Sequence, residues 1–125
     1  MATRILVVED EPDIATILTL MLETAGYEVA VAQTLGSARH VLAESTPPAL
    51  TLLDVALPDG NGLDLCHVLR RRWPEHPILV LTALADPATA RAATAAGCPE
   101  VIVKPFDPDT VLASVAHRLG RARAA

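Results

Sequence analysis

Apolar residues gather into five short runs along the chain, and the segments between the runs repeat apolar residues at helical spacing. The runs are rich in aliphatic residues and are predicted to be strands, at residues 5–8, 27–31, 49–54, 78–82 and 101–104. Runs that are apolar at nearly every position are typical of parallel strands buried on both faces of a sheet.

The segments between and after these runs carry signals that begin and end helices. Asp86-Pro87 and Asp107-Pro108 each combine a capping side chain with proline at the first helical position. Pro12 is placed to begin the first helix, and Gly26 to end it. The second helix, predicted over residues 37–43, is the weakest. The alternation predicts an α/β fold, a parallel sheet with helices on both faces and right-handed crossovers.

Length and composition indicate one domain with an aliphatic core. The 125 residues are 51% hydrophobic and only 2% aromatic. We expect a single domain over residues 1–125, with an ordered core at about 3–120 and a tail or linker stub at 121–125. Residues 58–62 are predicted to be a turn from their composition.

The net charge of -5 argues against nucleic-acid binding by this domain. Three basic residues lie near the C-terminus: Arg118, Arg121 and Arg123. We interpret them as the end of a helix, where positive charge suits the helix dipole. The alternative is a linker that leads to a second domain.

The remaining reactive side chains match no familiar site. Cys66 and Cys98 lie far apart in the sequence and fit neither a metal spacing nor a disulfide framework, so we expect a reducing cytoplasm. Neither a leader nor an apolar stretch long enough to cross a bilayer is present, so no membrane partner is expected.

Scattered histidines are expected at the surface: His40, His67, His76 and His117. Three acids are expected to be solvated or to cap helices: Asp13, Asp59 and Asp64.

Polar side chains stand where four of the apolar runs end. Glu9 and Asp10 follow the first run, Asp54 ends the third, Thr82 ends the fourth and Lys104 ends the fifth. Because the carboxyl ends of parallel strands share one edge of the sheet, and ligands bind at that edge, we expect these groups in one pocket.

Together these groups suit the chemistry of phosphoryl transfer. Three close carboxylates repel one another, and a hard divalent cation such as Mg²⁺ relieves that repulsion. A carboxylate beside Mg²⁺ can be a nucleophile that forms an aspartyl phosphate, here on Asp54, while Lys104 and Thr82 contact phosphoryl oxygens. Each residue alone has an ordinary interpretation as a helix cap, a turn residue or a surface residue. Their joint occurrence at the ends of separate strands favours a site that accepts a phosphoryl group over these separate interpretations.

Four motifs surround these residues. They are Val7-Val8-Glu9-Asp10-Glu11-Pro12, Leu53-Asp54 with Leu57-Pro58-Asp59-Gly60 and Gly62, Leu81-Thr82-Ala83, and Val103-Lys104-Pro105-Phe106. Over essentially its full length the chain resembles the receiver domains of two-component response regulators. The resemblance implies a flavodoxin-like (βα)5 doubly wound sheet with strand order 2-1-3-4-5. It also implies a signalling switch, not an enzyme, which catalyses only its own phosphorylation and dephosphorylation.

The same resemblance implies roles for individual residues and partners. Asp54 takes the phosphoryl group from a phosphohistidine of a sensor kinase or phosphotransfer protein. Asp10 and Asp54 ligate Mg²⁺ directly, Glu9 acts through water, and the backbone carbonyl of Ala56 is a further ligand. Ala83 keeps the site open, and the bond between Lys104 and Pro105 is expected to be cis. Phosphorylation then shifts the face of the fourth helix, fifth strand and fifth helix to control a partner or an appended output domain.

Several positions depart from the family pattern. Val101 stands where an aromatic residue usually reports phosphorylation, so we expect helix backbone or smaller packing changes to carry the signal. Ala56 and Leu84 cannot orient an attacking water, which predicts slow loss of phosphate. Ser114 and Cys98-Pro99 replace charged residues that join dimers in relatives, so a monomer or weak dimer is expected.

Three other functions stay open. A phosphorylation-independent interaction module is favoured only by Val101. A metal-dependent phosphohydrolase would need a general acid where Ala56 stands. A nucleotide-binding enzyme would need a glycine-rich phosphate loop after a strand, which this chain lacks.

Overall fold

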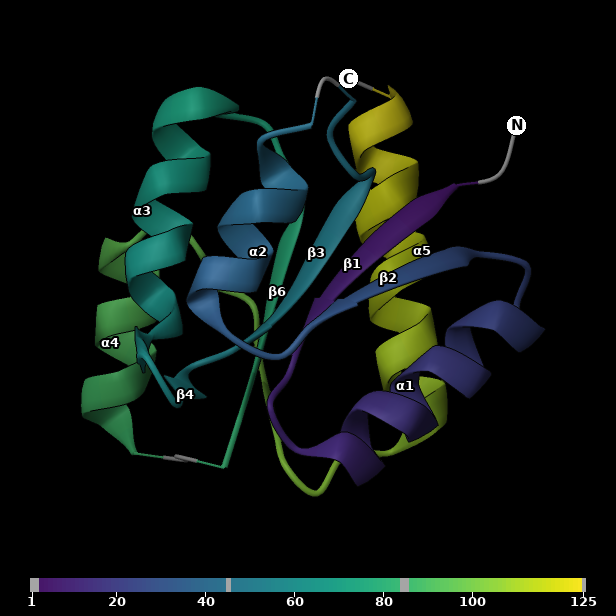
Figure 1. Cartoon of the computed structure of the whole chain (residues 1–125), viewed down its shortest axis with the longest axis horizontal. Helices are drawn as coiled ribbons and strands as arrows, with labels where there is room; N and C mark the ends of the chain where they lie inside the picture. The colour runs from purple at the N-terminus through teal and green to yellow at the C-terminus, as the bar shows by residue number, and fades with distance from the viewer. Residues whose placement is uncertain (1–2, 45, 84–85, 125) are drawn as a thin grey trace.

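A five-stranded sheet forms the centre of the computed structural model, which describes residues 3–44, 46–83 and 86–124. Its strands are β1 (Arg4–Val8), β2 (Glu28–Ala32), β3 (Leu50–Asp54), β6 (Ile78–Thr82) and β7 (Val101–Val103). They lie in the order β2-β1-β3-β6-β7, and each neighbouring pair is parallel (Figure 1). Counted among these five strands, this is the order 2-1-3-4-5, so the predicted flavodoxin-like fold is confirmed.

Helices cover both faces of the sheet. The helices are α1 (Pro12–Thr24), α2 (Leu35–Leu42), α3 (Gly62–Arg72), α4 (Pro87–Ala95) and α5 (Pro108–Ala124). In Figure 1, α1 and α5 lie on one side of the sheet and α2, α3 and α4 on the other. Ile5 and Val7 of β1 belong to the core under α1 and α5, whereas Leu6 and Val8 belong to the other core. Burial on both faces explains why the strand is apolar at every one of these positions.

The predicted helix boundaries are largely confirmed. Asp86 caps α4, because its Oδ1 accepts a hydrogen bond from the backbone N–H of Thr89 at 2.6 Å. Proline opens α1, α4 and α5, as the sequence predicts. Gly26 follows the end of α1 with φ of 98°, in the left-handed region that glycine adopts without strain. Among the described residues, no helix is apolar over a stretch sufficient to cross a membrane.

The second helix begins at Leu35, two residues before its predicted start. Thr34 caps it locally, accepting from the N–H of Ser37 at 3.0 Å. Asp59, from a loop distant in the sequence, accepts from the N–H groups of Leu35 at 2.8 Å and Gly36 at 3.0 Å. These acceptors satisfy N–H groups that have no partner inside the helix. Asp59 is therefore a capping residue, as predicted, but for a helix that its sequence neighbourhood does not identify.

The segment predicted as a turn, residues 58–62, closes a short antiparallel hairpin in which β4 (Ala56–Leu57) pairs with β5 (Gly60–Asn61). Asn61 then caps α3, because its Oδ1 accepts from the N–H of Leu63 at 2.8 Å. A Cβ atom at Gly62 would overlap the backbone carbonyl oxygen of Asp54, so only glycine lets α3 begin this close to the end of β3. The loop that follows Asp54 is therefore held tightly against the sheet edge.

One predicted surface residue is buried. His76 is only 7% exposed, and its Nε2 lies 2.9 Å from the hydroxyl oxygen of Thr51 on β3. Burial, and after it the nearby Arg70 cation, lower the pKa of His76 to about 4. The prediction for His76 was wrong because its partner lies on a strand far away in the sequence. The other histidines are exposed, as predicted: His40, His67 and His117.

Candidate functional site

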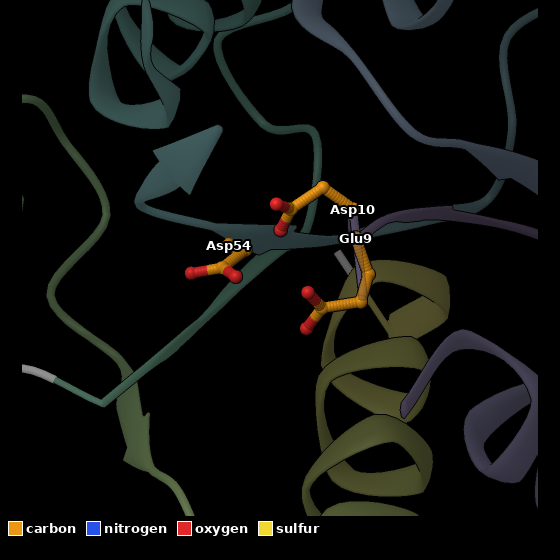
Figure 2. Close-up of side chains that lie close together, drawn as sticks. All are labelled: Glu9, Asp10 and Asp54. Carbon is orange, nitrogen blue, oxygen red and sulfur yellow. The ribbon is translucent and has the colours of Figure 1, made fainter. Parts of the chain in front are cut away.

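Three carboxylates meet at the C-terminal edge of the sheet. Glu9 and Asp10 directly follow β1, and Asp54 is the last residue of β3. One carboxylate oxygen from each lies within 4.8 Å of the others (Figure 2). Glu9 is fully buried, Asp54 is 4% exposed and Asp10 is half-buried. The parallel pairing of β1 with β3 brings their ends together, as the sequence predicts.

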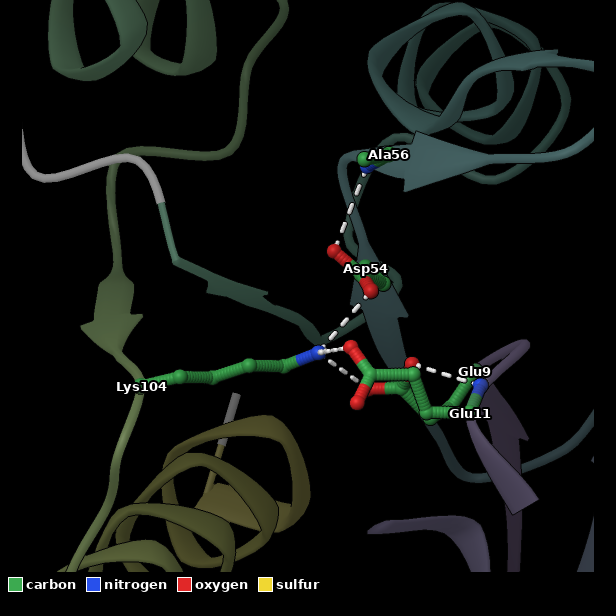
Figure 3. Close-up of polar contacts among 5 residues, drawn as sticks. All are labelled: Glu9, Glu11, Asp54, Ala56 and Lys104. Carbon is green, nitrogen blue, oxygen red and sulfur yellow. Dashed lines mark hydrogen bonds and ion pairs between the residues drawn. The ribbon is translucent and has the colours of Figure 1, made fainter. Parts of the chain in front are cut away.

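Lys104 reaches this cluster from the residue after β7 (Figure 3). Its Nζ lies 2.6 Å from Oε1 of Glu9 and 2.9 Å from Oδ2 of Asp54. The backbone N–H of Lys104 donates to the carbonyl oxygen of Thr82 at 2.8 Å, which holds the lysine beside β6. Burial opposes the charge of Lys104, but the two carboxylates outweigh it and raise the lysine pKa. The lysine is therefore a fixed cation for the acidic cluster.

The surroundings of Glu9 disfavour its charged form. Its pKa is raised to about 7, mainly by burial and also by Asp54, although the contact with Lys104 works in the opposite direction. Its Oε2 accepts from the backbone N–H of Glu11 at 3.2 Å. Its Oε1 contacts Lys104 as an ion pair but has no partner with hydrogen-bond geometry among the described residues. A second cation or a bound water would find a free lone pair on this oxygen.

The donor set of the cluster fits a hard divalent cation. The three groups offer only carboxylate oxygens, which Mg²⁺ and Ca²⁺ prefer, and no imidazole or thiolate belongs to this cluster. Three carboxylates face one lysine, so a divalent cation would balance the remaining charge. The buried Oε1 of Glu9 provides an additional acceptor. The structure thus contains an acidic cluster that can hold a metal ion.

The backbone around Asp54 restrains its carboxylate. Oδ1 accepts from the N–H of Ala56 at 3.2 Å, while Oδ2 contacts Lys104 (Figure 3). Ala56 is exposed at the start of β4, two residues after Asp54. Its predicted role as a backbone metal ligand stays a prediction.

Thr82 ends β6 and is buried, at 1% exposure. In the sheet register, Asp54 pairs with Leu81 and Thr82 pairs with Val103. Thr82 therefore stands one residue further along the edge than Asp54, and its phosphate contact stays a prediction. Ala83 is exposed beside it, and Leu84 lies outside the described residues.

Some details around the site escaped the sequence interpretation. Glu11, at the N-cap of α1, makes no capping hydrogen bond through its side chain, and its Oε1 lies 3.9 Å from Nζ of Lys104. Glu100 pairs with Arg118 of α5 at 3.3 Å, a contact between segments distant in the sequence. The bond between Lys104 and Pro105 is cis, as predicted. No local sequence signal announces the two ion pairs.

Comparison with known proteins agrees with this geometry. The model of the response regulator receiver domain family matches residues 5–116. The chain belongs to this family. The DNA-binding response regulator MtrA of Mycolicibacterium smegmatis is 39% identical over 121 residues, which are 97% of this chain and 52% of MtrA. The receiver domain spans about half the length of the curated relatives it matches.

Solved receiver domains share the same fold. A CheY-like receiver domain protein from Methanospirillum hungatei superposes with a TM-score of 0.92 and 28% identity, covering 99% of this chain and 98% of that one. The BeF3-activated receiver domain of DrrB, from Thermotoga maritima, superposes with a TM-score of 0.85 and 29% identity, covering 96% of this chain and 99% of that one. The predicted membership of the receiver family is confirmed.

Proposed function

We propose that this receiver domain is a phosphorylation-driven switch in which Asp54 accepts a phosphoryl group from a phosphohistidine. The observation that carries the proposal is the position of Asp54, a buried carboxylate 2.9 Å from a lysine and beside two further acids. Phosphoryl transfer depends mainly on positioning and on neutralising oxygen charge, and this cluster provides both. The DrrB neighbour, described as BeF3-activated, supports the same reading by analogy.

In the proposed reaction, a carboxylate oxygen of Asp54 attacks the phosphorus atom. The new oxygen–phosphorus bond forms as the phosphorus–nitrogen bond of the phosphohistidine breaks, and the imidazole leaves with the bonding electron pair. The Ala56 N–H fixes one carboxylate oxygen, which limits the orientations available to the other. The ammonium of Lys104, which contacts Asp54, would interact with one oxygen of the incoming phosphoryl group. The hydroxyl of Thr82 is proposed to donate a hydrogen bond to another oxygen of the same group.

Mg²⁺ is the metal that we propose for the acidic cluster. Asp10 and Asp54 would bind it directly, Glu9 through water, and the carbonyl of Ala56 would be a further ligand. The ion would supply neutralisation of the negative charge that builds up on the phosphoryl oxygens. Asp10, which is the most exposed of the three acids, leaves the cluster open to solvent and to a phosphodonor.

We propose that phosphorylation controls an output protein or a C-terminal output domain. MtrA, a relative of about twice this length, is a DNA-binding regulator by name, so the DNA-binding part of such a protein would lie outside this domain. The sensor partner would be a histidine kinase or a phosphotransfer protein, and the domain would modify only itself. Because Val101 is a small side chain, half-buried in the core beneath α2 to α4, backbone shifts in α4 are proposed to carry the signal. A monomer or weak dimer is proposed because Ser114 and Cys98-Pro99 stand where relatives carry the charged residues that join dimers.

The test is phosphorylation by a small phosphodonor. The domain is incubated with acetyl phosphate and Mg²⁺, and its intact mass is measured over time. We expect an added phosphoryl group, absent in Asp54→Asn and retained in the control Asp64→Asn, which changes an exposed acid of α3. An adduct that persists in Asp54→Asn, or no adduct at all, would contradict the proposal. Phosphate release without a lasting adduct would favour a phosphohydrolase instead.

A further inference from the structure

The loop between β3 and α3, residues 55–61, is attached at its tip to a helix from another part of the chain. Oδ1 of Asp59 accepts a hydrogen bond from the N–H of Leu35 at 2.8 Å, and Oδ2 accepts one from the N–H of Gly36 at 3.0 Å. Both oxygens of this carboxylate are therefore bound to the start of α2, although the residue itself is exposed. An exposed acid that only interacts with solvent would have no such fixed partners.

An apolar contact supports the same attachment. A Cβ atom at Gly60 would lie 2.9 Å from Cδ1 of Leu35, so the leucine side chain packs directly on the backbone of the loop tip. Leu35 is 6% exposed and belongs to the core cluster that also contains Val55 at the base of the loop. The tip of the loop is thus joined to α2 by two hydrogen bonds and by one buried side chain.

The same loop carries the backbone group that restrains the phosphoacceptor. The N–H of Ala56 donates to Oδ1 of Asp54 at 3.2 Å (Figure 3). Ala56 belongs to a hairpin of only two residue pairs, in which it lies opposite Asn61. A hairpin this short has little stability of its own, so its position depends on what holds its tip.

The start of α2 is connected to the acidic cluster from the other direction. The helix follows β2, and the carbonyl oxygen of Ala32 at the end of β2 accepts from the N–H of Glu9 at 3.0 Å. The connections form a closed ring that begins and ends in the acidic cluster. Its members are Glu9, Ala32, Leu35, Asp59, Ala56 and Asp54. Asp59 makes the side-chain link in this ring that joins the loop to α2.

We propose that Asp59 is a positioning residue, which fixes the backbone of Ala56, and through it the carboxylate of Asp54, by tying the loop to α2. Without its two hydrogen bonds the loop tip keeps only the apolar contact with Leu35. The Ala56 N–H would then restrain Asp54 for a smaller fraction of the time. One consequence rests on the proposed function, in which Asp54 and the Ala56 carbonyl bind Mg²⁺: a loosened loop binds the ion more weakly.

A second cap on the same helix separates this role from simple helix capping. Thr34 accepts a hydrogen bond from the N–H of Ser37 at 3.0 Å, so Thr34→Ala also removes a cap from α2. That substitution leaves the carboxylate of Asp59 and its two acceptor contacts in place. A residue that acts only as a helix cap would give the same result as Thr34 in any measurement on the loop.

The first test measures the backbone motion of Ala56 in the metal-free chain by NMR relaxation. In Asp59→Ala we expect the order parameter of the Ala56 N–H to fall from about 0.85 to below about 0.6, and in Thr34→Ala to stay near its original value. An unchanged value in Asp59→Ala, or an equal decrease in both variants, would overturn the proposal. Circular dichroism confirms that each variant is folded. If Asp59→Ala does not fold, Asp59→Asn replaces it.

The second test measures the Kd of Mg²⁺ alone by calorimetry. We expect a Kd roughly tenfold higher in Asp59→Ala and unchanged in Thr34→Ala. Asp59→Asn keeps one acceptor oxygen without the charge, so its Kd should lie between those of Asp59→Ala and the unsubstituted chain. A Kd for Asp59→Asn equal to that of Asp59→Ala would show that only the charge matters and would contradict the positioning role.

The failure of this inference differs from the failure of the proposed function. If Asp59→Ala binds Mg²⁺ normally and gains a phosphoryl group from acetyl phosphate as fast as the unsubstituted chain, the positioning role is wrong and the phosphorylation switch stands. If Asp59→Ala binds Mg²⁺ more weakly while the unsubstituted chain gains no phosphoryl group, the positioning role stands and the proposed function is wrong.

Discussion

At the scale of single residues, the site depends on one lysine. Lys104 is the only lysine in the sequence, and its ammonium contacts both Glu9 and Asp54. The exposed fraction of its side chain is 9%, so these contacts are far less screened than those of a surface ion pair. Removing one partner of such a pair leaves an uncompensated buried charge.

Replacing Lys104 should therefore destabilise the domain as well as impair the site. For Lys104→Met, we expect the free energy of unfolding in a chelator at neutral pH to fall by about 3–5 kcal/mol, because Glu9 and Asp54 lose their cation. Urea unfolding measures this change. Arg4→Met is the control, since Arg4 and Glu44 form an exposed pair at 3.5 Å that should contribute less than about 1 kcal/mol. Equal losses in the two variants would show that the burial of the Lys104 pair is unimportant.

His76 predicts a pH dependence of stability. Its pKa in the folded state, about 4, is below its ordinary value of 6.5, so the unfolded chain binds the proton more readily. The stabilising effect is fully present above pH 6.5 and is lost as the pH falls toward 4, by at most about 3 kcal/mol. In His76→Gln, this part of the pH dependence should disappear. The comparison is with His40→Gln, which changes an exposed histidine and should retain the slope of the unsubstituted chain.

At the scale of elements, the loop after Asp54 is tied to α2. Asp59 accepts two backbone hydrogen bonds from the first residues of that helix, and these bonds lower the pKa of Asp59. The same loop carries Ala56, whose N–H orients Asp54. The start of α2 and the backbone beside the phosphoacceptor are thus parts of one connected structure.

Removing the Asp59 cap should loosen the start of α2. In Asp59→Ala, the N–H groups of Leu35 and Gly36 lose their acceptors, so we expect faster hydrogen exchange at both and a lower midpoint of thermal unfolding. Asp64→Ala, in the first turn of α3, is the comparison variant and should leave exchange at Leu35 and Gly36 unchanged. Unchanged exchange at these two residues in Asp59→Ala would contradict the capping role.

At the scale of the whole molecule, two apolar clusters on opposite faces hold a sheet whose edge carries concentrated negative charge. The cores position Glu9, Asp10 and Asp54 near one another although their charges repel. The apolar burial of the strands sustains this arrangement, because the strand ends cannot separate without disrupting both cores. A cation bound at the edge would thus stabilise the entire fold.

Mg²⁺ should accordingly raise the stability of the domain. At a free Mg²⁺ concentration ten times its Kd, we expect a gain of about 1.4 kcal/mol, because the ion binds only the folded chain. Thermal unfolding with and without a chelator measures it. The gain should be lost in Asp10→Asn and retained in Asp13→Asn, which alters an exposed acid of α1. A Mg²⁺ response in Asp10→Asn equal to that of the unsubstituted chain would exclude the acidic cluster as the binding site.

Strand positions and the main site residues could be predicted because they depend on local patterns. The strand at residues 78–82 was predicted with its observed bounds, and β2 differed by one residue at each end. Glu9, Asp54 and Lys104 could be brought together in advance because each ends an apolar run, and parallel strands end at a common edge. The strand order came from the resemblance to receiver domains rather than from the apolar pattern.

The contacts that escaped prediction join loops or helices distant in the sequence. Asp59 caps α2 and His76 meets Thr51, and none of these residues carries a local sign of its partner. Loop residues have no fixed periodicity, so their side chains point where the packing of the elements directs them.

The amino-acid sequence by itself determined the approximate positions of the five main strands and of the helices, and therefore which polar groups reach the functional edge of the sheet. The reason is that the spacing of apolar residues and the capping signals are both properties of short segments. The tertiary structure alone decided the pairings at that edge and behind it. Lys104 contacts Glu9 and Asp54 because β7, β1 and β3 stand in one sheet in a particular register. Cys66 and Cys98 belong to one buried cluster because α3 and α4 cover the same face.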